Sequence, residues 1–136
     1  MKLKTLKRKY LCEAALMLVV AQFAVRFVAA ARIFAWADRP LRRVNRFAVG
    51  EVSWIAWAVE TISGNQRMNV LCLPRALALH AMMRRRGIAS RLCLGVAHDK
   101  EKLVAHAWVE IGDTAVALDP AVARFARLAE FGATPV

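Results

Sequence analysis

A two-residue connection at Gly112-Asp113 is the feature that most constrains how this chain folds. The segments on either side of it, Leu103–Ile111 and Thr114–Asp119, have β character, and a tight turn with glycine first joins antiparallel strands. Such a turn pairs the last residue of the first segment with the first residue of the second. Counting back along this ladder places His106 opposite Asp119, with Cβ atoms about 4.5–5.5 Å apart. We therefore expect an imidazole and a carboxylate to meet there.

The segment before these strands predicts a helix over Leu73–Arg86, because its apolar residues recur at helical spacing. Arginines in its last turn, followed by Gly87, are typical of a helix ending. A further strand is expected over Ser90–Ala97, joined to the next by the polar residues His98–Lys102, and Ala121–Phe131 is interpreted as a closing helix.

The front half of the chain shows no strand alternation. Residues from about Thr5 to Ser63 predict two or three helices, broken near Arg39-Pro40 and around Val49-Gly50, with Asp38 as a cap and Pro40 at a helix start. The order of elements predicts the α+β class. We expect one domain over 1–136: a helical region over 1–63, then 64–136 with a catalytic helix, a three-stranded antiparallel sheet and the closing helix.

The amino-terminal segment has a basic start and an apolar stretch, Ala14–Val25, which resembles a signal peptide. Glu13 and Gln22 interrupt the apolar character, and Arg26 ends the stretch short of the ~18 apolar residues of a membrane span. We expect a cytoplasmic helix packed on the domain. A signal or membrane anchor and an amphipathic helix lying on a surface remain the alternatives.

Charge and cysteine content limit the partners and the compartment. The formal net charge is +11, and residues 1–68 hold twelve basic against four acidic side chains, which favours an acidic partner. No nucleic-acid-binding motif is present, so we expect no nucleic-acid partner, and we do not expect membrane contact. Three widely spaced cysteines without a CxxC pair argue against disulfides and zinc, and indicate a reducing, cytoplasmic setting.

Cys72 is the candidate nucleophile, because it lies where the predicted helix begins. Unpaired N–H groups and the helix dipole favour a thiolate there, and lower the pKa of a thiol below about 8.5. In a triad, Cys72 attacks an acyl carbon, His106 exchanges protons, and Asp119 orients the imidazolium. The backbone N–H of Cys72 is a candidate oxyanion donor; Gln66 is either a second donor or a solvated loop residue.

The remaining cysteines and histidines have plainer interpretations. Cys12 and Cys93 are expected in the core, His80 is expected to pack on the apolar side of its helix, and His98 is expected to be solvated. Trp108 shares a face with His106, where it either shields the pair or packs beside it.

Three sequence motifs carry a family resemblance: Cys72-Leu-Pro-Arg-Ala-Leu-Ala-Leu, Leu94-Gly-Val-Ala, and Ala105-His-Ala-Trp-Val-Glu followed by Asp119. Together they resemble the B2 proteins of lasso-peptide biosynthesis, which are transglutaminase-like cysteine peptidases that remove leader peptides. The close match covers roughly residues 70–120. The helical front half agrees only in length and texture.

The resemblance implies a papain/transglutaminase-like fold and a triad that falls on Cys72, His106 and Asp119. It implies a precursor (leader-core) peptide as substrate, cut at the leader–core junction, with an asparagine-synthetase-like cyclase acting afterwards. No segment of this sequence has the pattern of the small β-rich recognition domain of the fused forms, so we expect a stand-alone peptidase with a separate B1 leader-recognition protein as partner. Some members require ATP, but no glycine-rich phosphate loop is visible. No cofactor or metal is predicted, and ATP dependence stays open.

The basic front half is a candidate contact for an acidic leader or for the B1 partner, through Arg39, Arg42, Arg43 and Arg46. Two alternatives to leader removal stay open. One is a transglutaminase-like acyl transferase or amidase that uses the same triad with another acceptor. The other is a non-catalytic basic binding partner in a peptide-maturation complex.

Overall fold

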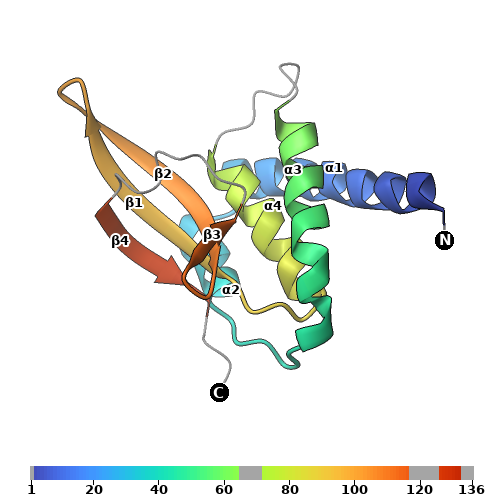
Figure 1. Ribbon diagram of the computed structural model, residues 1–136. Helices are drawn as coiled ribbons and strands as arrows, with labels where there is room; N and C mark the ends of the chain where they lie inside the picture. The colour runs from blue at the N-terminus through green and yellow to red at the C-terminus, as the bar shows by residue number, and fades with distance from the viewer. Residues whose placement is uncertain (1, 65–71, 117–125, 133–136) are drawn as a thin grey trace.

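The computed structural model describes residues 2–64, 72–116 and 126–132. Its elements, in chain order, are α1 (Leu3–Phe27), α2 (Ala30–Ala37), the 3-10 helix η1 (Arg46–Glu51), α3 (Val52–Ser63), α4 (Cys72–Arg85), β1 (Arg91–Asp99), β2 (Lys102–Ile111), β3 (Thr114–Val116) and β4 (Ala126–Phe131). Figure 1 shows α4 between the sheet on one side and α1 and α3 on the other. The α+β class predicted from the sequence is confirmed.

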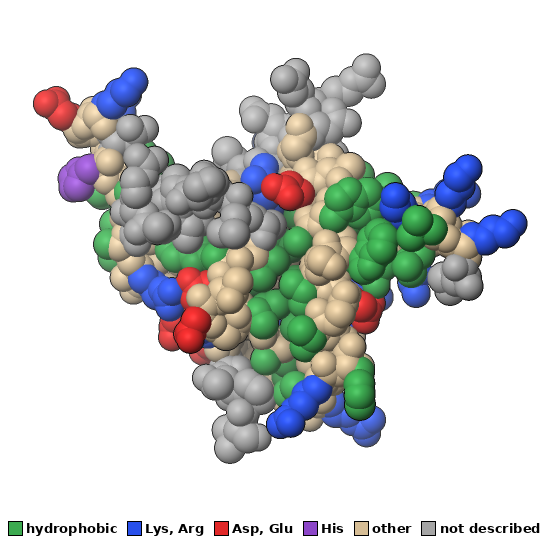
Figure 2. All heavy atoms as spheres, viewed as in Figure 1, with side chains coloured by type: hydrophobic (Ala, Val, Ile, Leu, Met, Phe, Trp, Pro, Cys, Tyr) green, Lys and Arg blue, Asp and Glu red, His purple; other side chains and the backbone are tan. Residues whose placement is uncertain are grey.

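Helix α1 is tied to the rest of the molecule by charge. The Glu13 carboxylate forms ion pairs with Arg85 (2.7 Å) and Arg86 (2.5 Å) at the end of α4. Among the described residues, α1 is the one helix long and apolar enough to cross a membrane, a test that core helices and signal sequences also pass. Figure 2 shows hydrophobic side chains beside lysines and arginines at the end of the molecule where α1 begins. Cys12 is exposed on this helix, so its predicted core position is wrong.

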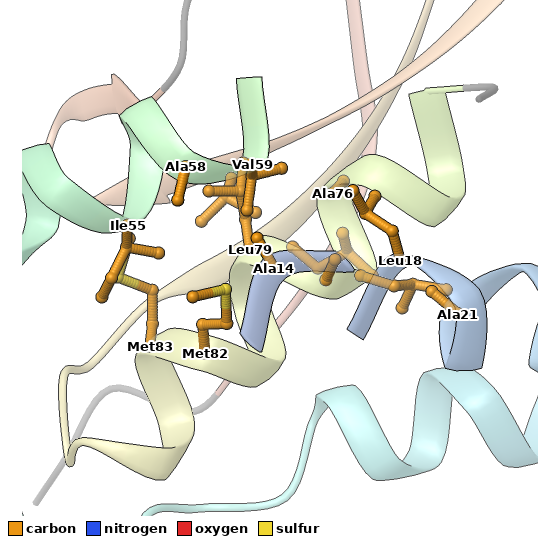
Figure 3. Packing of buried hydrophobic residues seen from close by; sticks show 14 of the residues in the cluster. Ala14, Leu18, Ala21, Ile55, Ala58, Val59, Ala76, Leu79, Met82 and Met83 are labelled. Atoms are coloured by element: carbon orange, nitrogen blue, oxygen red, sulfur yellow. The ribbon is translucent and has the colours of Figure 1, made fainter. Parts of the chain in front are cut away.

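The hydrophobic core is built around α4. Its buried side chains meet those of α1 and α3, which point toward them in Figure 3. Full burial of one large aliphatic side chain contributes roughly 1.5–3 kcal/mol. The inner face of the sheet closes the core from the other side with Leu92, Ala107 and Val109. The helical residues labelled in Figure 3 are Ala14, Leu18, Ala21, Ile55, Ala58, Val59, Ala76, Leu79, Met82 and Met83.

The sheet is antiparallel, with the strand order β3-β2-β1-β4. In the β2–β3 hairpin, Ile111 pairs with Thr114, as the sequence predicts. The β1–β2 hairpin is tighter than expected, because the ladder continues to Asp99 and Lys102. The polar connection predicted over His98–Lys102 is therefore wrong: the turn is Lys100-Glu101, whose φ angles are 47° and 70°.

The carboxyl-terminal helix predicted over Ala121–Phe131 is wrong where the structure describes it. Residues Ala126–Phe131 form β4, which pairs with the outer edge of β1 and makes the sheet four-stranded rather than three-stranded. Pairing satisfies the backbone groups along that edge of β1, and this outweighs the helix preference of Ala, Arg, Leu and Glu. The Phe131 ring also stacks on Phe34 of α2 at a centroid distance of 4.6 Å.

The helix boundaries agree with the sequence at one site and differ at another. Helix α4 ends at Arg85, and Gly87 adopts a φ of 73°, as predicted for a helix ending. Asp38 does not cap a following helix. It is the C-cap residue of α2, and its Oδ1 accepts a hydrogen bond of 3.0 Å from Gly132 N. Pro40 therefore lies in a non-helical connection. An unpredicted break separates α1 from α2 at Val28-Ala29.

Candidate active site

Cys72 is the first residue of α4, as the sequence predicts. Proline in the first turn of a helix removes no intrahelical hydrogen bond, and Pro74 occupies this position. The Cys72 side chain is half-buried and packs against the core. Its thiol therefore has a fixed place on the molecule while part of it stays accessible.

His106 and Cys72 line the same small pocket, with a volume of about 60 Å³. His106 comes from β2, and Val116 of β3 closes the pocket beside it. The first two turns of α4 supply the opposite wall. The structure thus brings together two of the three residues predicted for the triad. The other residues lining the pocket are Arg75, Ala76, Leu79, Ala107 and Trp108.

The Trp108 ring supports His106 from the same strand. The two rings stack with centroids 6.1 Å apart and an interplanar angle of 22°. The indole lies over Gly95 of β1, where a Cβ atom would come within 2.7 Å of the ring. Glycine at this position is therefore required for Trp108 to lie flat beside the histidine. Trp108 packs alongside His106 and also lines the pocket.

A buried carboxylate holds Trp108 in turn. Glu110 accepts a hydrogen bond of 2.8 Å from Trp108 Nε1. It also forms ion pairs with Arg91 of β1 (3.2 Å) and Arg127 of β4 (2.5 Å). These cations compensate the charge of a side chain that is only 9% exposed. The chain of contacts runs from the arginines through Glu110 and Trp108 to His106.

Arg75 is a pocket residue that the sequence reasoning did not single out. It lies three positions after Cys72 in α4, and this spacing puts two side chains on one face of a helix. Its Nε is buried without a hydrogen-bond partner among the described residues. The i, i+3 spacing from the thiol was the signal that could have identified it.

Two predicted site residues fall outside the described part of the chain. Asp119 follows β3 and lies beyond residue 116, and Gln66 lies between residues 64 and 72. Their expected roles as orienting acid and oxyanion donor stay predictions. The described part of the β2–β3 ladder, including Glu110 with Ala115, follows the register from which the His106–Asp119 pairing was predicted.

The other candidate groups have no place in this pocket. Cys93 is fully buried, as predicted for a core residue, and this burial, with a smaller effect from Glu110, raises the pKa of its thiol to about 11. His98 is exposed on β1. His80 is fully buried, with Nε2 2.8 Å from the Ala37 carbonyl and Nδ1 2.8 Å from Ser90 Oγ.

The surroundings of His80 fix its protonation. A carbonyl oxygen only accepts, so Nε2 carries the proton and Nδ1 accepts from the Ser90 hydroxyl. Burial lowers the pKa of His80 to about 4. The ring is neutral near pH 7 and joins α4 to the end of α2 and to the residue before β1, which confirms the predicted packing role. Among the residues described, no three His, Cys, Asp or Glu side chains gather as a metal site.

Comparison with known proteins identifies the family. The model of the transglutaminase-like superfamily matches residues 15–130. No curated protein and no solved structure gives a significant match. Members of this superfamily are generally cysteine-type catalysts, and the helix-borne thiol and strand-borne imidazole of the pocket have that chemistry. Because the matched residues span more than half of the chain, the protein belongs to the transglutaminase-like superfamily.

Proposed function

We propose that this protein is a cysteine peptidase that removes the leader from a lasso-peptide precursor. The observation that carries the catalytic part is the shared pocket of Cys72 and His106 in a transglutaminase-like chain. The choice of substrate is supported by the motif resemblance over residues 70–120, where the pocket's helix and strand lie.

The proposed reaction proceeds through an acyl-enzyme. The Cys72 thiolate attacks the carbonyl carbon of the scissile peptide bond, and His106 gives its proton to the departing amine of the core peptide. A thioester between Cys72 and the leader remains. His106 then takes a proton from water as its oxygen attacks the thioester carbon. The C–S bond breaks, Cys72 leaves as the thiolate, and the leader is released as a carboxylic acid that gives its proton to solvent. Asp119 is proposed to orient the imidazole throughout.

The pocket contributes more than the reacting groups. The guanidinium of Arg75 adds positive charge to the pocket that Cys72 lines. The backbone N–H of Cys72 is the proposed donor to the oxyanion, as is usual at a helix start. Neither acyl-transfer step itself consumes a metal ion or a nucleotide.

A second candidate is acyl transfer to an amine, because the superfamily match is equally compatible with it. The first half of the reaction is then identical. A primary amine instead of water attacks the thioester, so the product carries an amide in place of the leader's new carboxylate. The mass of the leader product separates the two reactions.

The proposed setting is a cytoplasmic maturation complex. The precursor peptide is the substrate, a B1 protein presents its leader, and an asparagine-synthetase-like cyclase closes the ring of the released core. These partners follow from the resemblance and from the basic charge of the chain.

Mass spectrometry of a precursor peptide incubated with this protein and a B1 partner tests the proposal. Wild type is compared with Cys72→Ala, and Cys12→Ala is the matched control, because that cysteine is exposed and outside the pocket. We expect a leader-sized fragment with wild type and with Cys12→Ala, and none with Cys72→Ala. Equal cleavage by Cys72→Ala would remove Cys72 as nucleophile and the mechanism with it.

A further inference from the structure

An apolar hollow opens on the side of the molecule where α1, α2 and α4 meet. Its volume is about 560 Å³, and its walls include Val20 and Val28 of the α1 side, Ile33 of α2 and Leu77 of α4. Val20 and Val28 are exposed, at 52% and 42%. Helix α1 therefore presents apolar surface to solvent within a concave site.

A second hollow of about 690 Å³ adjoins the first and is basic. It lies over the connection from α2 to η1 and the end of α4, and Arg39, Arg42 and Arg43 line it. Trp36, Arg84 and Arg85 line both hollows, which makes them one continuous surface. We call the two together the arginine groove.

The positive charge of the arginine groove is not neutralised from within. Arg85 and Arg86 are paired with Glu13, but no carboxylate lies within ion-pair distance of the five other arginines that line it, in the described part of the chain. Those five are Arg32, Arg39, Arg42, Arg43 and Arg84.

The contacts of Arg84 show how crowded this charge is. Its guanidinium lies over the Trp36 ring, 5.8 Å from the centroid, and donates a hydrogen bond of 2.6 Å to the Arg39 carbonyl. Burial, and then the charge of Arg39, lower the pKa of Arg84. The nearby carboxylate of Asp38 is turned to Gly132 N and does not line the groove. An anionic ligand in the groove would relieve this repulsion.

We propose that the arginine groove binds a segment of a partner polypeptide that carries apolar side chains next to carboxylates. The apolar side chains would enter the hollow between α1, α2 and α4, and the carboxylates would pair with the arginines beside it. Arginine suits this role, because its planar fork binds carboxylates in two-point contacts. The side chains of a peptide can enter a concave hollow, whereas the surface of a bilayer fits it less well. The groove is formed without Cys72 or His106, so the inference stands apart from the proposed peptidase activity.

Fluorescence anisotropy on full-length Cys72→Ala protein tests the groove without turnover. The probe is a labelled amphipathic peptide of leucine and glutamate, and a second peptide has glutamine at every glutamate. We expect the glutamate peptide to bind, and the triple variant Arg39→Ala/Arg42→Ala/Arg43→Ala to weaken its binding by about tenfold or more. The glutamine peptide should bind at least about tenfold more weakly than the glutamate peptide.

Two further variants separate the groove from net charge. Lys2→Ala/Lys4→Ala/Arg8→Ala removes the same number of charges from exposed positions where α1 begins, outside the groove, and we expect little change in binding. Val20→Ser/Val28→Ser changes two exposed wall residues, and we expect several-fold weaker binding. Equal weakening by both triple variants, or no effect of the serine variant, would overturn the groove as a binding site.

Sedimentation with vesicles of phosphatidylcholine and phosphatidylserine tests whether the groove binds an anionic membrane surface instead. Vesicle binding that is lost in the Arg39/Arg42/Arg43 variant, together with no binding of the glutamate peptide, would overturn the proposal in favour of a membrane surface. If the glutamate peptide binds as expected but the wild-type protein does not cleave the precursor, the groove proposal is supported and only the proposed peptidase activity is contradicted.

Discussion

The indole of Trp108 occupies the space above Gly95, where a Cβ atom would lie 2.7 Å from the ring and 2.8 Å from the Ala126 carbonyl oxygen. The ring that fills this space is also the one that stacks on His106. The lack of a side chain at Gly95 of β1 therefore determines how the Trp108 ring holds the imidazole of His106 on β2. The relationship makes a substitution outside the pocket a test of the pocket.

Gly95→Ala should displace Trp108 and disturb His106. Overpacking of this kind costs about 1–3 kcal/mol of unfolding free energy. We expect that loss in urea unfolding, together with slower precursor cleavage at a temperature where the variant is folded. Gly50→Ala is the matched control, since a Cβ atom added there would meet no other atom within 4 Å, and it should leave both measurements unchanged. Normal cleavage by Gly95→Ala would show that the Trp108 position is irrelevant to His106.

Glu110→Gln should loosen the support of Trp108 from the other end. The substitution keeps the size of the side chain but removes the charge that faces Arg91 and Arg127. We expect a loss of about 2–3 kcal/mol in unfolding free energy, because hydrogen bonds to a charged group are weakened in a buried site.

The control for this change is Glu130→Gln, which removes another carboxylate of the same network. The Glu130 side chain is 46% exposed, against 9% for Glu110. Exposed pairs contribute about 1 kcal/mol or less. Urea unfolding of the two variants at one pH gives the comparison, and an equal loss in both would contradict the special role of the buried carboxylate.

The pattern of residues predicted local structure well wherever one hairpin or helix determined it. The Gly112-Asp113 turn fixed the register of β2 and β3, and arginines before Gly87 marked the end of α4. The pairing of β4 with β1 was not predictable in this way. Its sequence favours a helix, and only the open edge of β1 and the Phe34 ring select the strand.

The candidate site divides along the same line. Residue spacing identified Cys72 and His106 separately. Their shared pocket depends on the packing of α4 against β2, and no local sequence pattern predicts that packing. Arg75 was within reach of a helical-spacing argument. Gly95 was not, because its role follows from the ring across the strand rather than from any turn.

Acid should destabilise the protein through His80. Its pKa of about 4 in the folded state lies below the ordinary histidine value of 6.5, so the unfolded chain binds the proton more readily. The stabilisation is complete above pH 6.5 and is lost as the pH falls toward 4, by about 3 kcal/mol in total. Urea unfolding between pH 7.5 and about 4.5 measures the slope. His80→Gln keeps a donor for the Ala37 carbonyl and should flatten this part of the profile; an unchanged slope would assign it to other groups.

Alkylation of the native protein by iodoacetamide should rank the three cysteines by their surroundings. Cys93 is buried and its raised pKa of about 11 leaves almost no thiolate near neutral pH, so it should react only after unfolding. Cys12 is exposed on α1 and serves as the internal reference for an accessible thiol outside the pocket. Peptide mapping by mass spectrometry reads all three rates in one sample.

Cys72 is expected to react faster than Cys12 although it is the less exposed of the two. Cys72 lies at the start of α4 and lines one pocket with His106, which in the proposed mechanism takes the proton of the thiol as it reacts. His106→Ala should slow Cys72 and leave Cys12 unchanged, because only Cys72 shares the pocket with the imidazole. A Cys72 that reacts no faster than Cys12, in both wild type and His106→Ala, would indicate an inert thiol and favour a binding role for the protein.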